Sequence, residues 1–256
     1  MSALEKLQTA RANGRPTGFD FINAVIDGFV ELHGDRRFGD DRAIVAGLGY
    51  LNDLPVTVIA LEKGHDTKEK LSRNFGSAHP EGYRKALRQM KLAEKFNRPI
   101  LCFVDTAGAY CGIEAEERGQ GQAIAENLME MMWLKVPVLS VLIGEGGSGG
   151  ALALAVANEV WMLENAVYSV ITPEGCASIL WKDPGKTKEA AESLKLTAED
   201  LYGLNVIERI VPEGAAMFEE LKATLYSTFC ALKAKDGQLL AQERYARFRN
   251  IGGSGA

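Results

Sequence analysis

The chain has 256 residues, of which 46% are hydrophobic and 25% charged, and its formal net charge is -5. These values are typical of a globular protein, and they exclude a nucleic-acid-binding protein that depends on an overall basic surface. The sequence contains no apolar run of 18 residues, so we expect no membrane-spanning helix. Its N-terminus has no apolar signal segment, and its four cysteines form no C-x-x-C pair (Cys102, Cys111, Cys176 and Cys230). We therefore expect a cytoplasmic protein with reduced thiols and no bound metal.

The first third of the chain predicts a helix, a hairpin and a basic loop. Phe19–Gly34 carries apolar residues at helical spacing and ends at a glycine, which predicts an N-terminal helix over about 17–34. Ala43–Leu51 and Pro55–Leu61 are rich in β-branched residues and are separated by a turn sequence, which predicts a β-hairpin. Lys63–His79 is polar and basic, and we expect it to be a loop.

From Pro80 onwards, apolar runs typical of buried strands alternate with helical patterns. The expected strands are Ile100–Val104, Val136–Ile143, Glu159–Leu163, Val167–Ile171 and Val206–Val211, and the expected helices begin at Pro80, after Gly121, at Ala151, at Pro173 and at Ala215. This alternation predicts an α/β fold with parallel strands. No linker interrupts it, so we expect one domain over 1–256, with a core of about 43–212, C-terminal helices over about 214–250 and a flexible Gly252–Ala256 tail.

The most informative segment is the glycine segment, Gly144–Gly150, which has five glycines in seven residues. One interpretation is a dinucleotide-binding G-x-G-x-x-G motif, formed by Gly144, Gly146 and Gly149, with Glu164 positioned to bind a ribose. That motif usually opens the first βαβ unit of a fold. Here a hairpin and another glycine-containing loop precede it, which counts against the interpretation.

A second interpretation is a G-x-S-x-G nucleophile elbow centred on Ser148. A serine nucleophile needs a base within hydrogen-bonding reach. The three histidines of the chain all precede Ser148, whereas an α/β-hydrolase places its histidine after the serine (His33, His65 and His79). The chain order therefore argues against a hydrolase.

A third interpretation is an oxyanion hole, because glycines at the start of a helix present N–H groups without intrahelical partners. Close packing of a strand on a helix, with no ligand, explains the glycines equally well. The loop Asp105–Gly112 also follows a buried strand, so two sets of N–H groups would surround one cleft, and this favours the oxyanion hole. For Asp105 we favour a role in holding its turn over a catalytic role.

Several motifs resemble the carboxyltransferase alpha subunit of acetyl-coenzyme A carboxylase. The resemblance extends from about Pro16 to Pro212 and is carried by GEGGSGGALA (144–153), YSVITPEGCASILWK (168–182), NFG (74–76), PEGYRKAL (80–87) and EERGQ (116–120). It implies a crotonase-like spiral of ββα units and an active site shared with a beta subunit in an α2β2 complex. The implied reaction transfers a carboxyl group from carboxybiotin to acetyl-CoA, giving malonyl-CoA for fatty acid biosynthesis. The carboxybiotin is held by the biotin carboxyl carrier protein, with biotin carboxylase as a further partner.

The same resemblance implies roles for backbone N–H groups rather than for a side-chain base or a cofactor bound by this chain alone. The N–H groups of the glycine segment would stabilise the ureido oxyanion of biotin (Gly146, Gly147, Gly149, Gly150 and Ala151). The second loop would contact substrate through Gly108, Ala109 and Tyr110. The family usually has proline where Ala107 and Cys111 stand, so we expect this loop to be more adaptable here.

The basic loop 63–73 is expected to hold coenzyme A phosphates or the beta subunit, through Lys68, Lys70 and Arg73. The basic face of the following helix is better explained as a solvated face. A dinucleotide-binding oxidoreductase and a non-catalytic scaffold subunit are the alternatives to the carboxyltransferase.

Overall fold

The computed structural model describes residues 1–253, and within this range eight strands form one mixed sheet. The sheet order is β1-β2-β3-β4-β5-β6-β8, and β7 pairs with the end of β5. The strands are β1 (Asp27–Glu31), β2 (Ile44–Leu51), β3 (Leu54–Leu61), β4 (Ile100–Thr106), β5 (Val138–Gly147), β6 (Glu159–Leu163), β7 (Val167–Ser169) and β8 (Arg209–Val211). Residues 254–256, the end of the tail that we expected to be flexible, lie outside the described range.

The first three strands are antiparallel, and the predicted hairpin is confirmed as β2 and β3. The predicted helix over 17–34 is wrong in its second half. Helix α2 (Gly18–Val25) begins at a capping box of Thr17 and Asp20 and ends at Ile26. Gly28, within β1, has a φ of 61°, which is incompatible with a helix, and lies where the pairing of β1 with β2 is irregular. Sheet pairing therefore overrides the helical spacing of the apolar residues.

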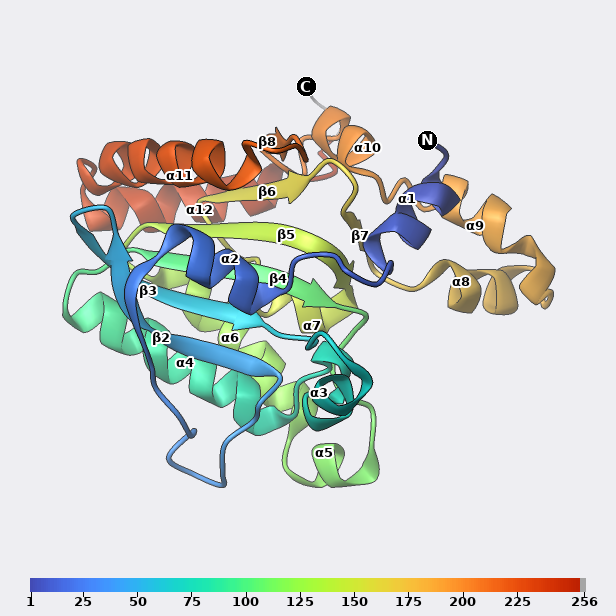
Figure 1. Ribbon diagram of the computed structural model, residues 1–256, viewed down its shortest axis with the longest axis horizontal. Helices are drawn as coiled ribbons and strands as arrows, with labels where there is room; N and C mark the ends of the chain where they lie inside the picture. Colours follow the sequence, from blue (N-terminus) through green and yellow to red (C-terminus); the bar gives the residue numbers. More distant parts are fainter. Residues whose placement is uncertain (254–256) are drawn as a thin grey trace.

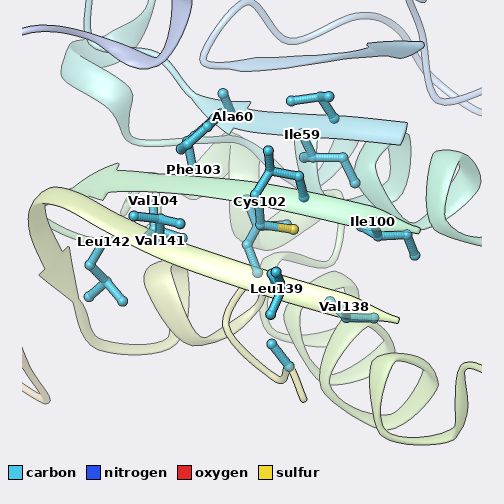
Figure 2. Close-up of a cluster of buried hydrophobic side chains, with 14 of the residues drawn as sticks. Ile59, Ala60, Ile100, Cys102, Phe103, Val104, Val138, Leu139, Val141 and Leu142 are labelled. Atoms are coloured by element: carbon cyan, nitrogen blue, oxygen red, sulfur yellow. The ribbon is translucent and has the colours of Figure 1, made fainter. Parts of the chain in front are cut away.

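The remaining strands are parallel, which confirms the predicted α/β core. Every residue of β4 and β5 is buried, as continuous apolar runs require when both faces of a strand are covered. Figure 2 shows the side chains that β3, β4 and β5 contribute to this core.

Helices connect the strands and cover the sheet. They are α1 (Ala3–Ala10), α2, α3 (Thr67–Ser72), α4 (Pro80–Lys95), α5 (Ile113–Glu117), α6 (Gln120–Trp133), α7 (Ser148–Leu152), α8 (Pro173–Leu180), α9 (Thr187–Ser193), α10 (Ala198–Gly203), α11 (Met217–Lys233) and α12 (Gly237–Asn250), with short 3-10 turns η1 (Asn74–Gly76) and η2 (Pro184–Lys186). The segment expected to be a basic loop thus contains α3, and the loop after β4 contains α5. In the described part of the chain, no helix is both long and apolar enough to cross a membrane.

Two groups of helices pack on the sheet. Helix α2 packs on β3, β4 and α11, and Phe21 contacts the rings of Phe103 and Phe218. Helix α4 packs on β2, β3 and α6, and α12 packs on α6. Figure 1 shows α2 in front of the sheet and α4 and α6 behind it.

Helices α8 and α9 form a hairpin that projects from the sheet, at the right of Figure 1. Its apolar contacts form a small cluster of Cys176, Ala177 and Ala190, separate from the main core. Helix α1 packs against α9 and β7 through a second small cluster that includes Leu7, Val167 and Ala191. The N-terminal helix therefore lies between the hairpin and the sheet.

Candidate active site

The two glycine-containing segments meet at the carboxyl ends of β4 and β5. These ends point to the same edge of the sheet, beside α7 (Figure 1). A Cβ atom at Gly147 would overlap the carbonyl group of Ala107, and one at Gly150 would overlap the backbone of Gly108 and Ala109. The backbones of the two segments therefore pack directly on each other, and glycine is required at both positions for this approach.

The boundary of the glycine segment differs from the prediction, because Gly144–Gly147 belong to β5 and not to a loop. Their missing side chains make room for neighbouring groups: a Cβ at Gly144 would overlap the Asp105 carboxylate, and one at Gly146 would overlap Leu142. The chain leaves the strand at Ser148, which has a φ of 47° and opens α7. The helix expected to begin at Ala151 thus begins three residues earlier.

The N–H groups at the start of α7 are available to a ligand. Gly149 and Gly150 are the second and third residues of the helix, so neither N–H group has an acceptor one turn earlier in α7. Within residues 1–253, no other backbone or side-chain acceptor is found for either N–H group. Gly149 is half-buried and Gly150 is buried, whereas Ser148 is exposed.

The second loop offers fewer free donors than the sequence indicated. The Gly108 N–H donates to Thr106 Oγ1 at 3.1 Å, and the Tyr110 N–H donates to the carbonyl oxygen of Ala78 at 3.0 Å. Gly108 and Tyr110 are therefore placed at the edge of the site, with their N–H groups already bonded within the protein. The backbone of Ala109 packs against Gly150.

A mainly apolar groove of about 410 Å³ opens beside the start of α7. Its lining includes Ser148, Gly149 and Leu152 from α7, and Tyr168, Val170 and Leu194 from β7 and the segments after it. Burial raises the pKa of Tyr168 to about 12, so its hydroxyl stays protonated at neutral pH. The groove thus places a half-buried N–H group beside an apolar surface that could hold a ring.

Three side chains to which the sequence analysis assigned no role at the site hold the two segments in place. Tyr83 of α4 donates from its buried hydroxyl to the carbonyl oxygen of Gly150 at 3.4 Å. Gln120 Nε2 donates to the carbonyl oxygens of Ala78 and Tyr110 at 2.8 and 2.9 Å, and the His79 ring stacks on Tyr110 at 4.0 Å. Tyr83 and Gln120 lie in the motifs PEGYRKAL and EERGQ, but the sequence did not show that they contact the two segments.

Asp105 binds the backbone of β5 at Glu145, whereas we expected it to bind the backbone of the turn that follows it. Its Oδ1 accepts the N–H of Glu145 at 2.8 Å and lies 2.5 Å from Lys63 Nζ. Glu145 is itself buried and receives two hydrogen bonds from Arg11, at 3.0 and 2.6 Å. A network of charged side chains therefore lies behind the glycine segment.

Within the basic segment, Lys63 contacts the site, whereas Lys70 and Arg73 bind other parts of the chain. Lys63 contacts Asp105, but Lys70 Nζ donates to Asn13 Oδ1 at 2.9 Å and Arg73 donates to the carbonyl oxygen of Arg42 at 2.7 Å. Lys68 is exposed on α3. The structure thus places Lys70 against Asn13 and Arg73 against Arg42, and neither contacts Gly149. In the part of the chain described, no group of three His, Cys, Asp or Glu side chains could hold a metal ion.

The fold is that of the crotonase-like carboxyltransferases. A transcarboxylase 12S structure aligns with 88% of this chain at a TM-score of 0.73 and 17% identity, although the chain spans only 43% of that protein. The malonate decarboxylase hetero-tetramer of Pseudomonas, solved with coenzyme A, aligns over 91% of this chain and 97% of its own at a TM-score of 0.69 and 19% identity. At these identities the likeness establishes the fold alone.

Closer relatives establish the family. The family model described as "Acetyl co-enzyme A carboxylase carboxyltransferase-like" matches residues 1–252. The acetyl-coenzyme A carboxylase carboxyl transferase subunit alpha of Ruminiclostridium cellulolyticum is 62% identical over 256 residues, covering 98% of both chains. A protein of Natranaerobius thermophilus named as subunits beta/alpha is 55% identical over 260 residues, and this chain spans 43% of its length. The chain belongs to the acetyl-CoA carboxylase carboxyltransferase alpha-subunit family.

This assignment confirms the resemblance read from the motifs and gives no support to a dinucleotide-binding oxidoreductase. The structure agrees, because Gly144 and Gly146 lie inside β5 and not in a strand-to-helix loop.

Proposed function

We propose that this chain supplies the biotin-facing half of a carboxyltransferase active site, which it completes with a beta subunit. The carboxylated biotin of a carrier protein would enter the groove beside Gly149. The other substrate, acetyl-CoA, would be held mainly by the beta subunit. Carboxyl transfer between the two would yield malonyl-CoA and biotin.

The observation that carries this proposal is the pair of unbonded N–H groups at Gly149 and Gly150. When the carboxyl group leaves biotin as carbon dioxide, negative charge develops on the ureido oxygen. Fixed N–H groups aimed at such an oxygen stabilise the transition state, and loss of one donor typically lowers kcat by about a hundredfold to a thousandfold. The biotin anion would then take a proton from the acetyl methyl group, and the resulting carbanion would attack carbon dioxide.

The scheme needs no side-chain base beside the glycine segment, because the biotin anion itself accepts the proton from the acetyl methyl group. Ala151, Gly146 and Gly147 would shape the backbone around the donors, since each is buried and closely packed.

The partners extend the same proposal. The name of the Natranaerobius thermophilus relative joins beta and alpha subunits in one chain, which supports a beta subunit as the immediate partner. We extend this to an α2β2 complex that works in the cytoplasm with the biotin carboxyl carrier protein and biotin carboxylase. Lys68, Lys70 and Arg73 would contact coenzyme A phosphates or the beta subunit at the edge of the site.

Reconstitution tests the proposal. The purified chain, a beta subunit from a family member, malonyl-CoA and biocytin are mixed, and decarboxylation of malonyl-CoA is followed. We expect turnover only when both chains are present, and none with either alone. A mixture that forms the complex by mass but shows no biocytin-dependent turnover would disprove the proposal.

A separate variant distinguishes catalysis from a scaffold role. Gly149→Val should lower turnover strongly while leaving the native mass of the complex unchanged. A Cβ at this position meets Ile124 at 3.5 Å, so the branched side chain would crowd Ile124 and displace the N–H donors at the start of α7. Full turnover of this variant in an intact complex would favour the non-catalytic scaffold.

A further inference from the structure

The N-terminal helix ends in a residue that contacts both the glycine segment and the α8–α9 hairpin. Arg11, the C-cap of α1, donates to both carboxylate oxygens of Glu145, at 3.0 Å from Nε and 2.6 Å from Nη2. Its Nη1 donates to Glu174 Oε1 at 2.7 Å. One guanidinium group therefore binds two carboxylates that come from different parts of the fold.

Glu145 belongs to the glycine side of the groove. It lies in β5 immediately before Gly146 and Gly147, and its side chain is 8% exposed. A buried carboxylate requires a cation or hydrogen bonds, and Arg11 supplies both in bidentate geometry. The position of this strand end, from which the N–H donors follow, thus depends on Arg11.

Glu174 belongs to the α8–α9 hairpin, which connects two residues that line the groove. It lies in the first turn of α8, whose N-cap Thr172 is separated by one residue from the groove-lining Val170. Leu194, at the C-terminal end of α9, also lines the groove. Burial alone would raise the pKa of Glu174, but the hydrogen bond from Arg11 lowers it, so the carboxylate stays charged.

Backbone pairing holds the two ends of the α8–α9 hairpin, since β7 before it pairs with β5 and Thr197 after it pairs with Val167. Its own apolar cluster is small and separate from the main core, and segments with few buried apolar contacts have low local stability. Helix α1 contacts the hairpin through Ala3, whose N–H donates to Glu192, and through its packing on α9.

The chain after α9 is joined to β7 by a hydrogen bond from the Tyr168 N–H to the carbonyl oxygen of Leu196, at 3.0 Å. The charged hydrogen bond from Arg11 to Glu174 is the side-chain contact that joins the start of α8 to β5 through Glu145.

We propose that Arg11 is a positioning residue that sets the width of the groove by joining the strand of the glycine segment to the α8–α9 hairpin. It acts through Glu145 and Glu174 and does not touch the substrate. The kinetic part of this inference rests on the proposed function, whereas the effect on the hairpin does not.

Three variants test the two ion pairs that Arg11 makes, with Glu145 and with Glu174. Arg11→Gln removes the charge from both pairs, and Glu174→Gln removes it from the pair with the hairpin. Arg11→Lys keeps the charge, but one ammonium group cannot bind both carboxylates in the same geometry. Lys6→Met is the matched control. Lys6 is buried on the same helix and binds Glu199 of α10 and the carbonyl oxygen of Glu164, but it contacts neither Glu145 nor Glu174.

The readouts are hydrogen exchange of residues 173–194 and steady-state kinetics of the complex with the beta subunit. We expect Arg11→Gln and Glu174→Gln to speed exchange in the hairpin. Arg11→Gln should also raise the KM for biocytin and lower kcat by about tenfold, with the KM for malonyl-CoA unchanged. Arg11→Lys should be intermediate. Lys6→Met should lower thermal stability but should not raise the KM for biocytin relative to the KM for malonyl-CoA.

Two results would overturn the inference: Glu174→Gln leaving both hairpin exchange and the KM for biocytin at wild-type values, or Lys6→Met reproducing the kinetic pattern of Arg11→Gln. If the wild-type complex shows no turnover, the proposed function fails instead. The hydrogen-exchange comparison then still decides whether Arg11 holds the hairpin.

Discussion

Tyr83 reaches from the buried face of α4 to the glycine segment, where its hydroxyl donates to the carbonyl oxygen of Gly150 at 3.4 Å. Burial raises the pKa of this hydroxyl, so it remains protonated and can donate at neutral pH. The carbonyl oxygen of Gly150 belongs to the same peptide group as the N–H of Ala151. Tyr83 therefore helps to orient the backbone that follows the proposed donors.

Tyr83→Phe should weaken this orientation without disturbing the core. A neutral hydrogen bond contributes about 1 kcal/mol, so if all of it is lost from the transition state, kcat falls roughly fivefold. The free energy of unfolding should fall by a similar amount, measured by urea denaturation. Tyr245→Phe, at an exposed position of α12, is the control. An unchanged kcat together with reduced stability would restrict Tyr83 to a structural role.

Gly150→Ala should damage the site far more. The added methyl group would overlap the backbone of Ala109, so one of the two segments must move. Because the N–H donors are displaced with the backbone, we expect kcat to fall by about a hundredfold or more, with a loss of about 1–3 kcal/mol in stability. Gly121→Ala is the control, since no atom lies within 4 Å of a Cβ at this position. Wild-type kinetics in Gly150→Ala would contradict the proposed role of this backbone.

Much of the fold could be predicted because burial leaves a pattern in the sequence. The predicted strands Ile100–Val104 and Val136–Ile143 are almost entirely apolar, as strands covered on both faces are, and they are confirmed as β4 and β5. Pro80 marks a helix start that the structure confirms. The helix predicted through Gly34 failed because Phe29 fits a helical and a strand spacing equally. Only the long-range pairing of β1 with β2 decides between them.

The site could be predicted in part for a related reason. Glycines are conspicuous in a sequence, so the two segments that approach each other were found. The contact that supports them was not found, because Arg11 and Glu145 are 134 residues apart and Arg11 belongs to none of the motifs. The sequence likewise showed Gly108 as a candidate donor but not that Thr106 already accepts its N–H.

Reversing the charge of Lys68 and Lys70 tests the basic segment. Both cations lie in α3, and Lys70 is held by Asn13. If the segment binds coenzyme A phosphates, Lys68→Glu/Lys70→Glu should raise the KM for malonyl-CoA by roughly tenfold at low salt and less at high salt. If it binds the beta subunit, the complex should dissociate instead, as seen by native mass. Lys233→Glu, exposed on α11, is the control. If the KM and the complex both stay unchanged, the segment is a solvated surface.

Arg244 fastens the C-terminal helix to the core. Its buried guanidinium donates to the carbonyl oxygens of Met131 and Leu134, at 2.7 and 2.9 Å, and to Asn158 Oδ1 at 2.6 Å. Burial lowers the pKa of Arg244 to about 10, so the group stays charged at neutral pH. Arg244→Met leaves these acceptors unpaired and should lower the free energy of unfolding by about 3 kcal/mol. Arg249→Met, exposed on the same helix, should change it by less than about 0.5 kcal/mol. Equal unfolding midpoints for the two variants would contradict this account.

The lowered pKa of Asp40 predicts how the free energy of unfolding changes at acidic pH. Burial alone would raise its pKa, but hydrogen bonds from Lys85 Nζ at 2.6 Å and from the Gly34 N–H at 2.8 Å lower the pKa to about 2. A carboxyl group whose pKa is lower in the folded state than in the unfolded state, where it is about 3.9, stabilises the fold above pH 4. That contribution disappears as the pH falls from 4 towards 2. Because about a third of the side chain is exposed, screening by solvent reduces it to about 1 kcal/mol.

Urea denaturation of wild type and Asp40→Asn between pH 2 and pH 6 measures this contribution by difference, since the other carboxylates titrate in both proteins. We expect the wild type to be more stable at pH 6 and the two curves to converge near pH 2. Glu219→Gln, exposed on α11, should follow the wild type throughout. A constant difference across the whole range would mean that Asp40 acts through packing. In that case the buried Lys85 ammonium would depend on the carbonyl oxygen of Asp41, 2.7 Å away, and not on the charge of Asp40.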